Sequence, residues 1–163
     1  MTTGASATSP SGAAREFDDC LCLVARQAAR AITDLYDLVL SPAKMRATQY
    51  ILLRILAREG DVSQQRLGMM LCVAPETMSR RLSALRSAGL IKLCSGLRGR
   101  ERVYALTETG KARLKVAAPY WRRSQTRMRT CMSREQWAEA PSFLRCLVTV
   151  ARNAESARLR NTG

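Results

Sequence analysis

The sequence of 163 residues contains no histidine. This absence excludes Ser-His-Asp and Cys-His catalysis and every metal site that uses an imidazole ligand. The six cysteines include no Cys-x-x-Cys pair, so zinc-ribbon and thioredoxin-like motifs are absent too. A Gly-rich phosphate loop and a motif of paired carboxylates are also missing. The sequence therefore predicts a protein that is not an enzyme and that holds no metal ion or cofactor.

Long apolar segments and aromatic residues are scarce as well. No apolar run approaches the ~18 residues of a membrane span, and the N-terminus lacks the apolar segment of a signal peptide. We therefore expect a cytoplasmic protein that does not bind membranes and whose cysteines are mostly reduced. Aromatic residues make up only 5% of a chain that is 47% hydrophobic, and this composition favours helices over a β-sandwich.

Acidic residues are few in one part of the chain only. The formal net charge is +14, yet residues 1–61 carry seven basic and seven acidic side chains. Residues 62–163 carry twenty basic and six acidic side chains, which is the whole excess. A basic region of this kind favours a polyanionic partner, because neutralising phosphates releases condensed counterions.

The segment over residues 62–106 organises the rest of the chain. A short helix capped by Ser63 precedes a turn, and Pro75 stands at the first position of a second helix, where its missing N–H costs nothing. Two short strands follow, over about 90–94 and 102–106, around a basic tip with two glycines. Helix, turn, helix and basic hairpin in this order predict a winged helix-turn-helix, a module that places a helix in the major groove of DNA.

Helices are predicted on both sides of this segment. Apolar residues recur every three or four positions from about residue 15 to residue 40, and a second helix, capped by Thr48, ends at Gly60. Two further helices follow the strands, the last one opened by the capping box Ser133-x-x-Gln136. The predicted fold is therefore mainly α, with a small β-wing and flanking N- and C-terminal helices.

The order of these elements resembles the multiple-antibiotic-resistance regulator (MarR) family over about residues 17–152. The most telling stretches are LRSAGLI at residues 85–91 and RVYALTETGK at residues 102–111. The resemblance implies a homodimer that binds palindromic DNA, with dimerisation helices over residues 15–44 and 108–153 around a winged-helix domain at 45–107. Residues 1–14 are expected to form a disordered tail and residues 154–163 a frayed one.

The DNA-binding residues are predicted from the second helix and the wing. Short polar side chains near the start of a recognition helix come closest to base edges, and arginines reach guanine or phosphate. Glu76 has two possible roles, as an acceptor for cytosine N4 or as a charge that stabilises the helix dipole. The full set is Pro75, Glu76, Thr77, Ser79, Arg80, Arg81, Ser83, Arg86, Arg98, Arg100 and Arg102.

The wing departs from the family pattern at one position. The family usually has Asp-x-Arg in the wing, shortly before the Leu-Thr pair. Arg100 matches the arginine of that motif, whereas Arg98 stands where the aspartate is expected. We therefore expect a more positive wing that depends more on phosphate attraction than on the shape of the minor groove.

Three hypotheses remain open for regulation and specificity. A repressor of the MarR type would be released from its operator by a small-molecule effector, held by Tyr36, Met45, Arg46, Gln49, Tyr50 and Met70. A regulator of the same fold could instead sense an oxidant or a soft metalloid through Cys20 and Cys22, with Cys131 nearby. The third alternative is a basic nucleic-acid-binding scaffold without sequence specificity.

Overall fold

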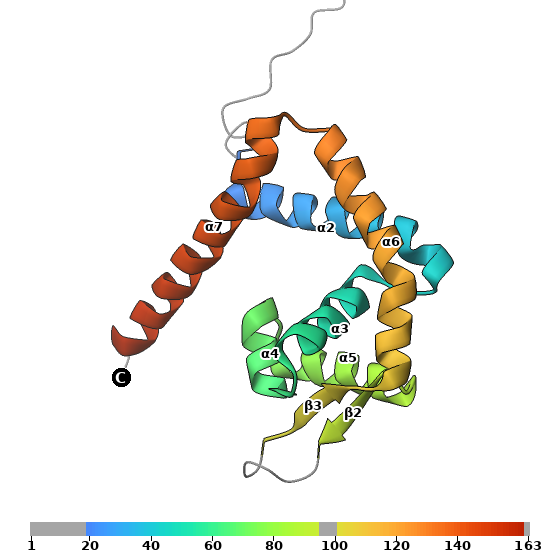
Figure 1. Ribbon diagram of the computed structural model, residues 1–163. Coiled ribbons are helices and arrows are strands. Elements are labelled where there is room, and N and C mark those ends of the chain that lie inside the picture. Colours follow the sequence, from blue (N-terminus) through green and yellow to red (C-terminus); the bar gives the residue numbers. More distant parts are fainter. Residues whose placement is uncertain (1–18, 95–100, 162–163) are drawn as a thin grey trace, which may run out of the picture. The chain divides into compact units, whose positions relative to one another are not determined.

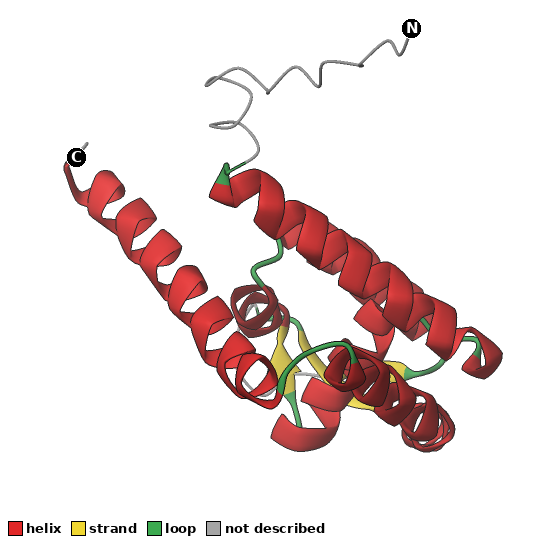
Figure 2. Ribbon diagram, turned by 90° about the horizontal axis from the view of Figure 1, so that it is seen from above, coloured by secondary structure: helices red, strands yellow, loops and turns green. Residues whose placement is uncertain are grey.

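The computed structural model describes residues 19–94 and 101–161, with side chains through residue 154. It is mainly helical with a small sheet, as predicted (Figures 1 and 2). The predicted tail over residues 1–14 and the wing arginines Arg98 and Arg100 lie outside the described residues. In chain order the elements are α2 (Leu21–Leu40), η1 (Ser41–Ala43), α3 (Ala47–Glu59), β1 (Val62–Ser63), α4 (Gln64–Leu71), α5 (Pro75–Ser87), β2 (Ile91–Cys94), β3 (Val103–Leu106), α6 (Glu108–Thr130) and α7 (Arg134–Asn161).

The first two helices begin at other residues than the sequence indicates. Helix α2 begins at Leu21 rather than near residue 15, and its first turn holds no acidic side chain. Helix α3 begins at Ala47, before the predicted cap Thr48, with Arg46 as the N-cap residue and Gln49 accepting from the Arg46 N–H. The Ala47 N–H donates to Asp37 Oδ1 over 2.7 Å. A side chain from another helix therefore adds to the capping of α3, and local spacing does not reveal this contact.

The sheet has three antiparallel strands in the order β1-β3-β2. The hairpin of β2 and β3 is as predicted, with Leu93 opposite Tyr104. Strand β1 is an addition that the sequence analysis missed, because the same residues read as the start of a helix. It pairs Val62 with Tyr104 and Ser63 with Val103. The start of α4 is thereby joined directly to the root of the wing.

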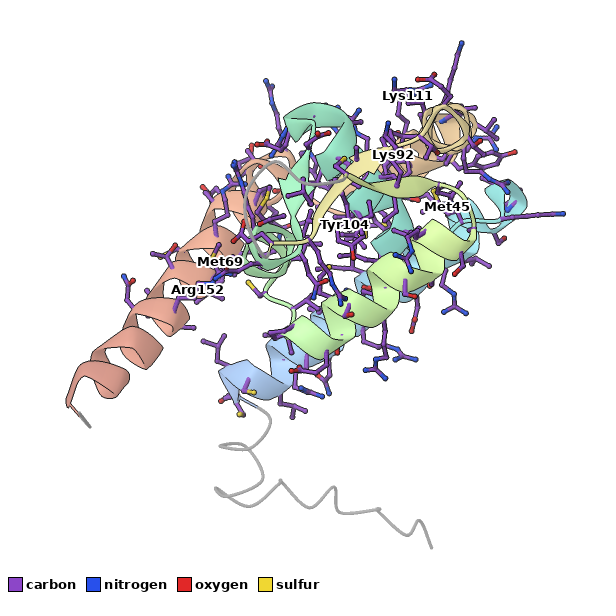
Figure 3. The ribbon with its side chains drawn as sticks, turned by 90° about the horizontal axis from the view of Figure 1, so that it is seen from below. Met45, Met69, Lys92, Tyr104, Lys111 and Arg152 are labelled. Carbon is purple, nitrogen blue, oxygen red and sulfur yellow. The ribbon has the colours of Figure 1, made fainter. Side chains whose placement is uncertain are left out.

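The core of residues 19–120 lies between the helices and one face of this sheet. Tyr104, only 4% exposed, lies among the interior side chains in Figure 3, while Lys92 of the neighbouring strand lies at the surface. The largest fully buried apolar side chains come from α2 to α5 and β2: Leu40, Leu52, Leu53, Leu56, Leu67, Met78, Leu82, Leu85 and Ile91. Burying each of them contributes about 1.5–3 kcal/mol.

A close backbone contact joins the end of α5 to the start of α6. Thr107 caps α6, since the Gly110 N–H donates to its Oγ1 over 3.0 Å. The same hydroxyl donates to the Gly89 carbonyl over 2.7 Å, and the Thr107 N–H donates to the Leu90 carbonyl over 3.2 Å. A Cβ on Gly110 would collide with that Leu90 carbonyl oxygen, so a residue without a side chain is needed there.

The chain divides into two compact units, residues 1–120 and 121–163. The second unit contains the end of α6 and the whole of α7. The predicted capping box is confirmed: the Ser133 N–H donates to Gln136 Oε1 over 2.9 Å and the Gln136 N–H to Ser133 Oγ over 3.2 Å. Helix α7 continues to Asn161, whereas the polar sequence had suggested fraying from about residue 154.

The close contact at Gly110 can be tested by substitution. Alanine usually stabilises a helix by up to about 1 kcal/mol relative to glycine. We expect the opposite for Gly110→Ala, a decrease of about 1–3 kcal/mol in the free energy of unfolding, because the new methyl group would overpack against backbone. Urea denaturation followed by circular dichroism measures it. Thr109→Ala, at the neighbouring exposed position, is the control and should change stability by less than about 0.5 kcal/mol.

Candidate nucleic-acid interface

Helix α5 is the element around which the candidate site is built. Helix α4 precedes it, capped by Ser63, whose Oγ accepts from the Arg66 N–H over 3.3 Å. Cys72 then turns the chain with a left-handed backbone, at φ 51°. Pro75 occupies the first turn of α5, as predicted. Two helices joined by a short turn, with α5 beside the strands β2 and β3, form a helix-turn-helix with an attached hairpin (Figure 1).

The two sides of α5 differ sharply in exposure. Met78, Leu82 and Leu85 are buried, at 0%, 0% and 1% exposure. Their burial fixes the rotation of the helix about its own axis, so the polar residues between them are left facing outward. Among the predicted DNA-binding residues, Thr77, Ser79 and Arg81 are half-buried, and the exposed ones are Pro75, Glu76, Arg80, Ser83, Arg86 and, outside α5, Arg102.

The exposed face of α5 is electrostatically available to an anion. Residues 62–107 contain eight basic and two acidic side chains. None of the ion pairs found among the described residues involves Arg80, Arg81 or Arg86. The guanidinium of Arg80 instead lies over the first turns of the helix, where its Nη2 donates to Thr77 Oγ1 over 3.4 Å. Glu76 is in the first turn of the helix, where its charge suits the dipole whether or not it also contacts a base.

One residue that the sequence analysis did not single out links three parts of this site. The Gln64 N–H donates to the Arg102 carbonyl over 2.9 Å, and its side-chain Nε2 donates to the Pro75 carbonyl over 3.4 Å. Gln64 therefore connects α4, the root of the wing and the start of α5. Its position after the N-cap Ser63 predicts only the first residue of a helix, so the sequence carries no local signal for this role.

The proposed effector residues are distributed between the core and the surface. Tyr36, Met45 and Tyr50 are core residues, at 7%, 4% and 4% exposure, and burial raises the pKa of the Tyr36 hydroxyl. Gln49 is half-buried, and its Oε1 accepts from the Arg46 N–H over 2.9 Å. The sixth residue, Met70 of α4, is 37% exposed.

The charge of Arg46 already has a neighbour of opposite sign. Its exposed guanidinium lies 3.8 Å from the carboxylate of Asp37, which also caps α3. A carboxylate ligand at Arg46 would therefore compete with Asp37 for the same guanidinium.

The cysteines are free thiols in different surroundings. Cys20 is the N-cap of α2 with an extended backbone, Cys22 is exposed in the first turn, and Cys131 is exposed after α6. Burial raises the pKa of the Cys94 thiol, and the nearby carboxylate of Asp61 raises it further through its charge and a hydrogen bond. Since the thiolate is the reactive form, Cys94 is kept in its less reactive state.

Neither a metal site nor a membrane-spanning helix is found in the described parts of the chain. Over residues 19–94 and 101–161 no three His, Cys, Asp or Glu side chains come together as a metal site would require. Within the same ranges no helix is both long and apolar enough to cross a membrane.

Comparison with known proteins agrees with this geometry. Residues 45–92 match the model of the MarR family, and this range contains α3, α4, α5 and the start of the hairpin. Over these residues the chain is similar to the MarR family. No curated protein matches the chain.

Solved structures extend this similarity over most of the chain. The chain is 28% identical to the M. tuberculosis transcriptional regulator MosR in complex with DNA, with a TM-score of 0.72 and coverage of 86% of this chain and 99% of that one. A variant of MarR from E. coli complexed with operator DNA gives 18% identity, a TM-score of 0.71 and coverage of 78% and 92%. The regulator PcaV from Streptomyces coelicolor, solved with its natural ligand, is 19% identical, with a TM-score of 0.73 and coverage of 82% of this chain and 95% of that one. The fold is thus that of a DNA-binding transcriptional regulator and not of an enzyme.

The exposed face of α5 yields a direct prediction. We expect Arg80→Ala to weaken binding to an operator, selected from a random duplex library, by at least about 1 kcal/mol, because it removes a cation from the middle of the polar face. Fluorescence anisotropy at physiological salt measures the affinity. Arg54→Ala removes the same charge from an exposed position of α3 outside the predicted DNA-binding set and serves as the control. Unchanged operator binding by Arg80→Ala would remove this residue from the interface.

Proposed function

We propose that the chain is a homodimeric repressor that binds a palindromic operator and is released from it by a small-molecule effector. The observation that carries the proposal is the two-sided α5, with Met78, Leu82 and Leu85 buried and a polar, arginine-bearing face exposed. The DNA-bound states of MosR and of the E. coli MarR variant, recorded for those proteins, support DNA as the partner.

The proposed contacts divide between base reading and phosphate attraction. Thr77, Ser79 and Ser83 are short enough to meet base edges in a major groove, and Arg80 can reach guanine or a phosphate. Arg81, Arg86 and Arg102 supply further cations around this face, with Pro75 and Glu76 at its leading end. Arg98 and Arg100 are proposed to add contacts from the wing.

Large apolar side chains exposed on the flanking helices support a dimer. In α2, Leu21 is 58% exposed and Leu38 66% exposed. In α7, Phe143 and Val150 are each 60% exposed, and they are seven residues apart on one helical face. Surfaces this apolar favour burial against another chain. We therefore assign dimerisation to residues 15–44 and 108–153 and DNA binding to residues 45–107.

An effector would act where α2 meets α3. Buried Tyr36, Met45 and Tyr50 lie near the Asp37–Arg46 pair at the start of α3. A ligand that separates this pair would shift the start of α3 relative to α2, and α3 packs on β3 of the winged helix. PcaV, which has the same fold, was solved with a natural ligand, and this supports a small-molecule effector here.

Binding to selected duplexes tests the proposal. We expect a dimer on a duplex with two inverted half-sites, whose centres are about 34 Å apart, one turn of B-DNA. We also expect affinity at least ~10³-fold above that for random duplex. Analytical ultracentrifugation gives the stoichiometry and anisotropy the ratio. Equal affinity for operator, random duplex and single-stranded RNA would support the non-specific scaffold instead.

Transcription in vitro then tests repression and release. We expect the protein to block a promoter that overlaps the operator, and an effector to restore transcription at protein concentrations that otherwise saturate the site. Activation of that promoter would contradict the assignment as a repressor.

The start of α2 favours a second candidate, a regulator of the same fold switched by thiols. On an ideal helix, residues two apart point about 200° from one another, so two such cysteines could not meet. Here α2 begins at Leu21, and Cys20 has a non-helical backbone, with φ −63° and ψ 111°. That constraint is therefore relaxed for Cys20 and Cys22, which form the proposed switch.

Mass spectrometry distinguishes the thiol switch from six ordinary cysteines. We expect mild oxidant or arsenite to modify Cys20 or Cys22 first and to lower operator affinity, while Cys94 stays unmodified because its raised pKa keeps it protonated. A Cys20→Ser, Cys22→Ser variant should keep its affinity under the same treatment. The absence of any adduct at Cys20 and Cys22 would eliminate the switch.

A further inference from the structure

Gln64 has an arrangement that stability alone does not explain. Its side-chain Oε1 is buried and has no hydrogen-bond partner in the described parts of the chain. Leaving a buried acceptor unpaired destabilises the folded state, and such groups are uncommon in folded proteins. The other end of the same amide, Nε2, is directed at the Pro75 carbonyl at 3.4 Å.

The orientation of this amide is constrained by Pro75. Turning the amide over would place Oε1 against the Pro75 carbonyl oxygen, and two acceptors would then face each other. The observed orientation avoids that repulsion and leaves Oε1 unpaired. The hydrogen bond from Nε2 to the Pro75 carbonyl therefore leaves Oε1 of the same amide without a donor.

The backbone of Gln64 anchors this side chain to the sheet. Its N–H donates to the Arg102 carbonyl over 2.9 Å, directly beyond the pairing of Ser63 with Val103. The side chain thus extends from a backbone position that belongs to the root of the wing. It ends on Pro75, the first residue of α5, two residues before Thr77 and five before Arg80.

We infer that Gln64 is a positioning residue for DNA recognition, which fixes the N-terminal end of α5 relative to the wing. The inference rests on the proposed function, since it concerns how the recognition helix meets an operator. The proposed role of Gln64 is not a contact with DNA, because its Nε2 is directed at the Pro75 carbonyl and its Oε1 is buried. When the spacing between α5 and the wing is correct, both elements can contact the same operator simultaneously. Gln64 therefore affects the specificity of binding more than the general attraction for phosphate.

Stability and specificity are expected to respond differently to Gln64→Met. Methionine keeps the length of the side chain and removes both the donor and the unpaired acceptor. The Pro75 carbonyl keeps its bond within α5, so no new unpaired group is created. We expect an unfolding midpoint equal to or above that of the wild-type chain, because an apolar replacement of a half-satisfied group is neutral or stabilising.

The ratio of operator affinity to random-duplex affinity is the decisive measurement. We expect Gln64→Met to lower this ratio by about threefold or more, the scale of coupling within one hydrogen-bond network. We also expect Arg80→Ala to cost less specificity in the Gln64→Met background than in the wild-type chain, since Arg80 is then less well placed. Gln65→Met, at the neighbouring exposed glutamine, is the matched control and should change neither quantity.

The results separate this inference from the proposed function. A wild-type chain that selects no operator contradicts the proposed function itself. A selective wild-type chain with an unchanged ratio in Gln64→Met overturns the inference alone, as do strictly additive effects of Gln64→Met and Arg80→Ala. If Gln64→Met does not fold, Gln64→Leu is measured in the same way, and the same two outcomes decide.

Discussion

The burial of one face of α5 is the interaction on which the rest of the structure depends. Met78, Leu82 and Leu85 are almost completely inaccessible, and each contributes about 1.5–3 kcal/mol by leaving water. Because these residues recur every three or four positions, their burial also sets the helix rotation. The outward direction of the polar residues between them is thus a consequence of core packing. No further interaction is needed to expose the polar face of α5 to solvent.

Rotation alone does not place a helix, and the two ends of α5 are held by contacts of different kinds. At the C-terminal end, Thr107 bonds to the Gly89 and Leu90 carbonyls, and Gly110 permits the close approach of α6. At the N-terminal end, the amide of Gln64 reaches the Pro75 carbonyl. Thr107 directly follows β3 and Gln64 directly follows β1. The sheet therefore fixes the position of both ends of the recognition helix.

Charge and short-range geometry have different parts in the proposed recognition. The excess of cations over residues 62–163 attracts any nucleic acid over a distance limited by salt screening. Discrimination requires short polar side chains such as Thr77 and Ser79 at base edges, and these work only if α5 is correctly placed. A chain with the same charge and a loosely held α5 would bind nucleic acid with little selectivity. The contacts at Gln64 and Thr107 therefore matter more for specificity than their individual bond energies indicate.

The sequence by itself determined the elements whose signals are local. Ser63 as a cap, Pro75 at the start of α5, the spacing of Met78, Leu82 and Leu85, and the Ser133–Gln136 capping box all depend on residues within one or two helical turns. The hairpin was recognisable for the same reason. These elements together gave the resemblance to the MarR family, whose model matches residues 45–92. The exposure of the α5 face also followed from periodicity, because an apolar stripe must be buried and its opposite face must then meet solvent.

Only the tertiary structure decided the contacts between segments far apart in the chain. Asp37 caps α3 from α2, β1 joins the sheet through Val62 and Ser63, and Gln64 reaches Pro75. These contacts leave no local signal, because the partners are selected by how the segments pack and not by their neighbours in sequence. The contact of Asp37 with α3, the third strand and the positioning of the recognition helix could therefore not be predicted from the sequence. They depend on where the chain folds back on itself.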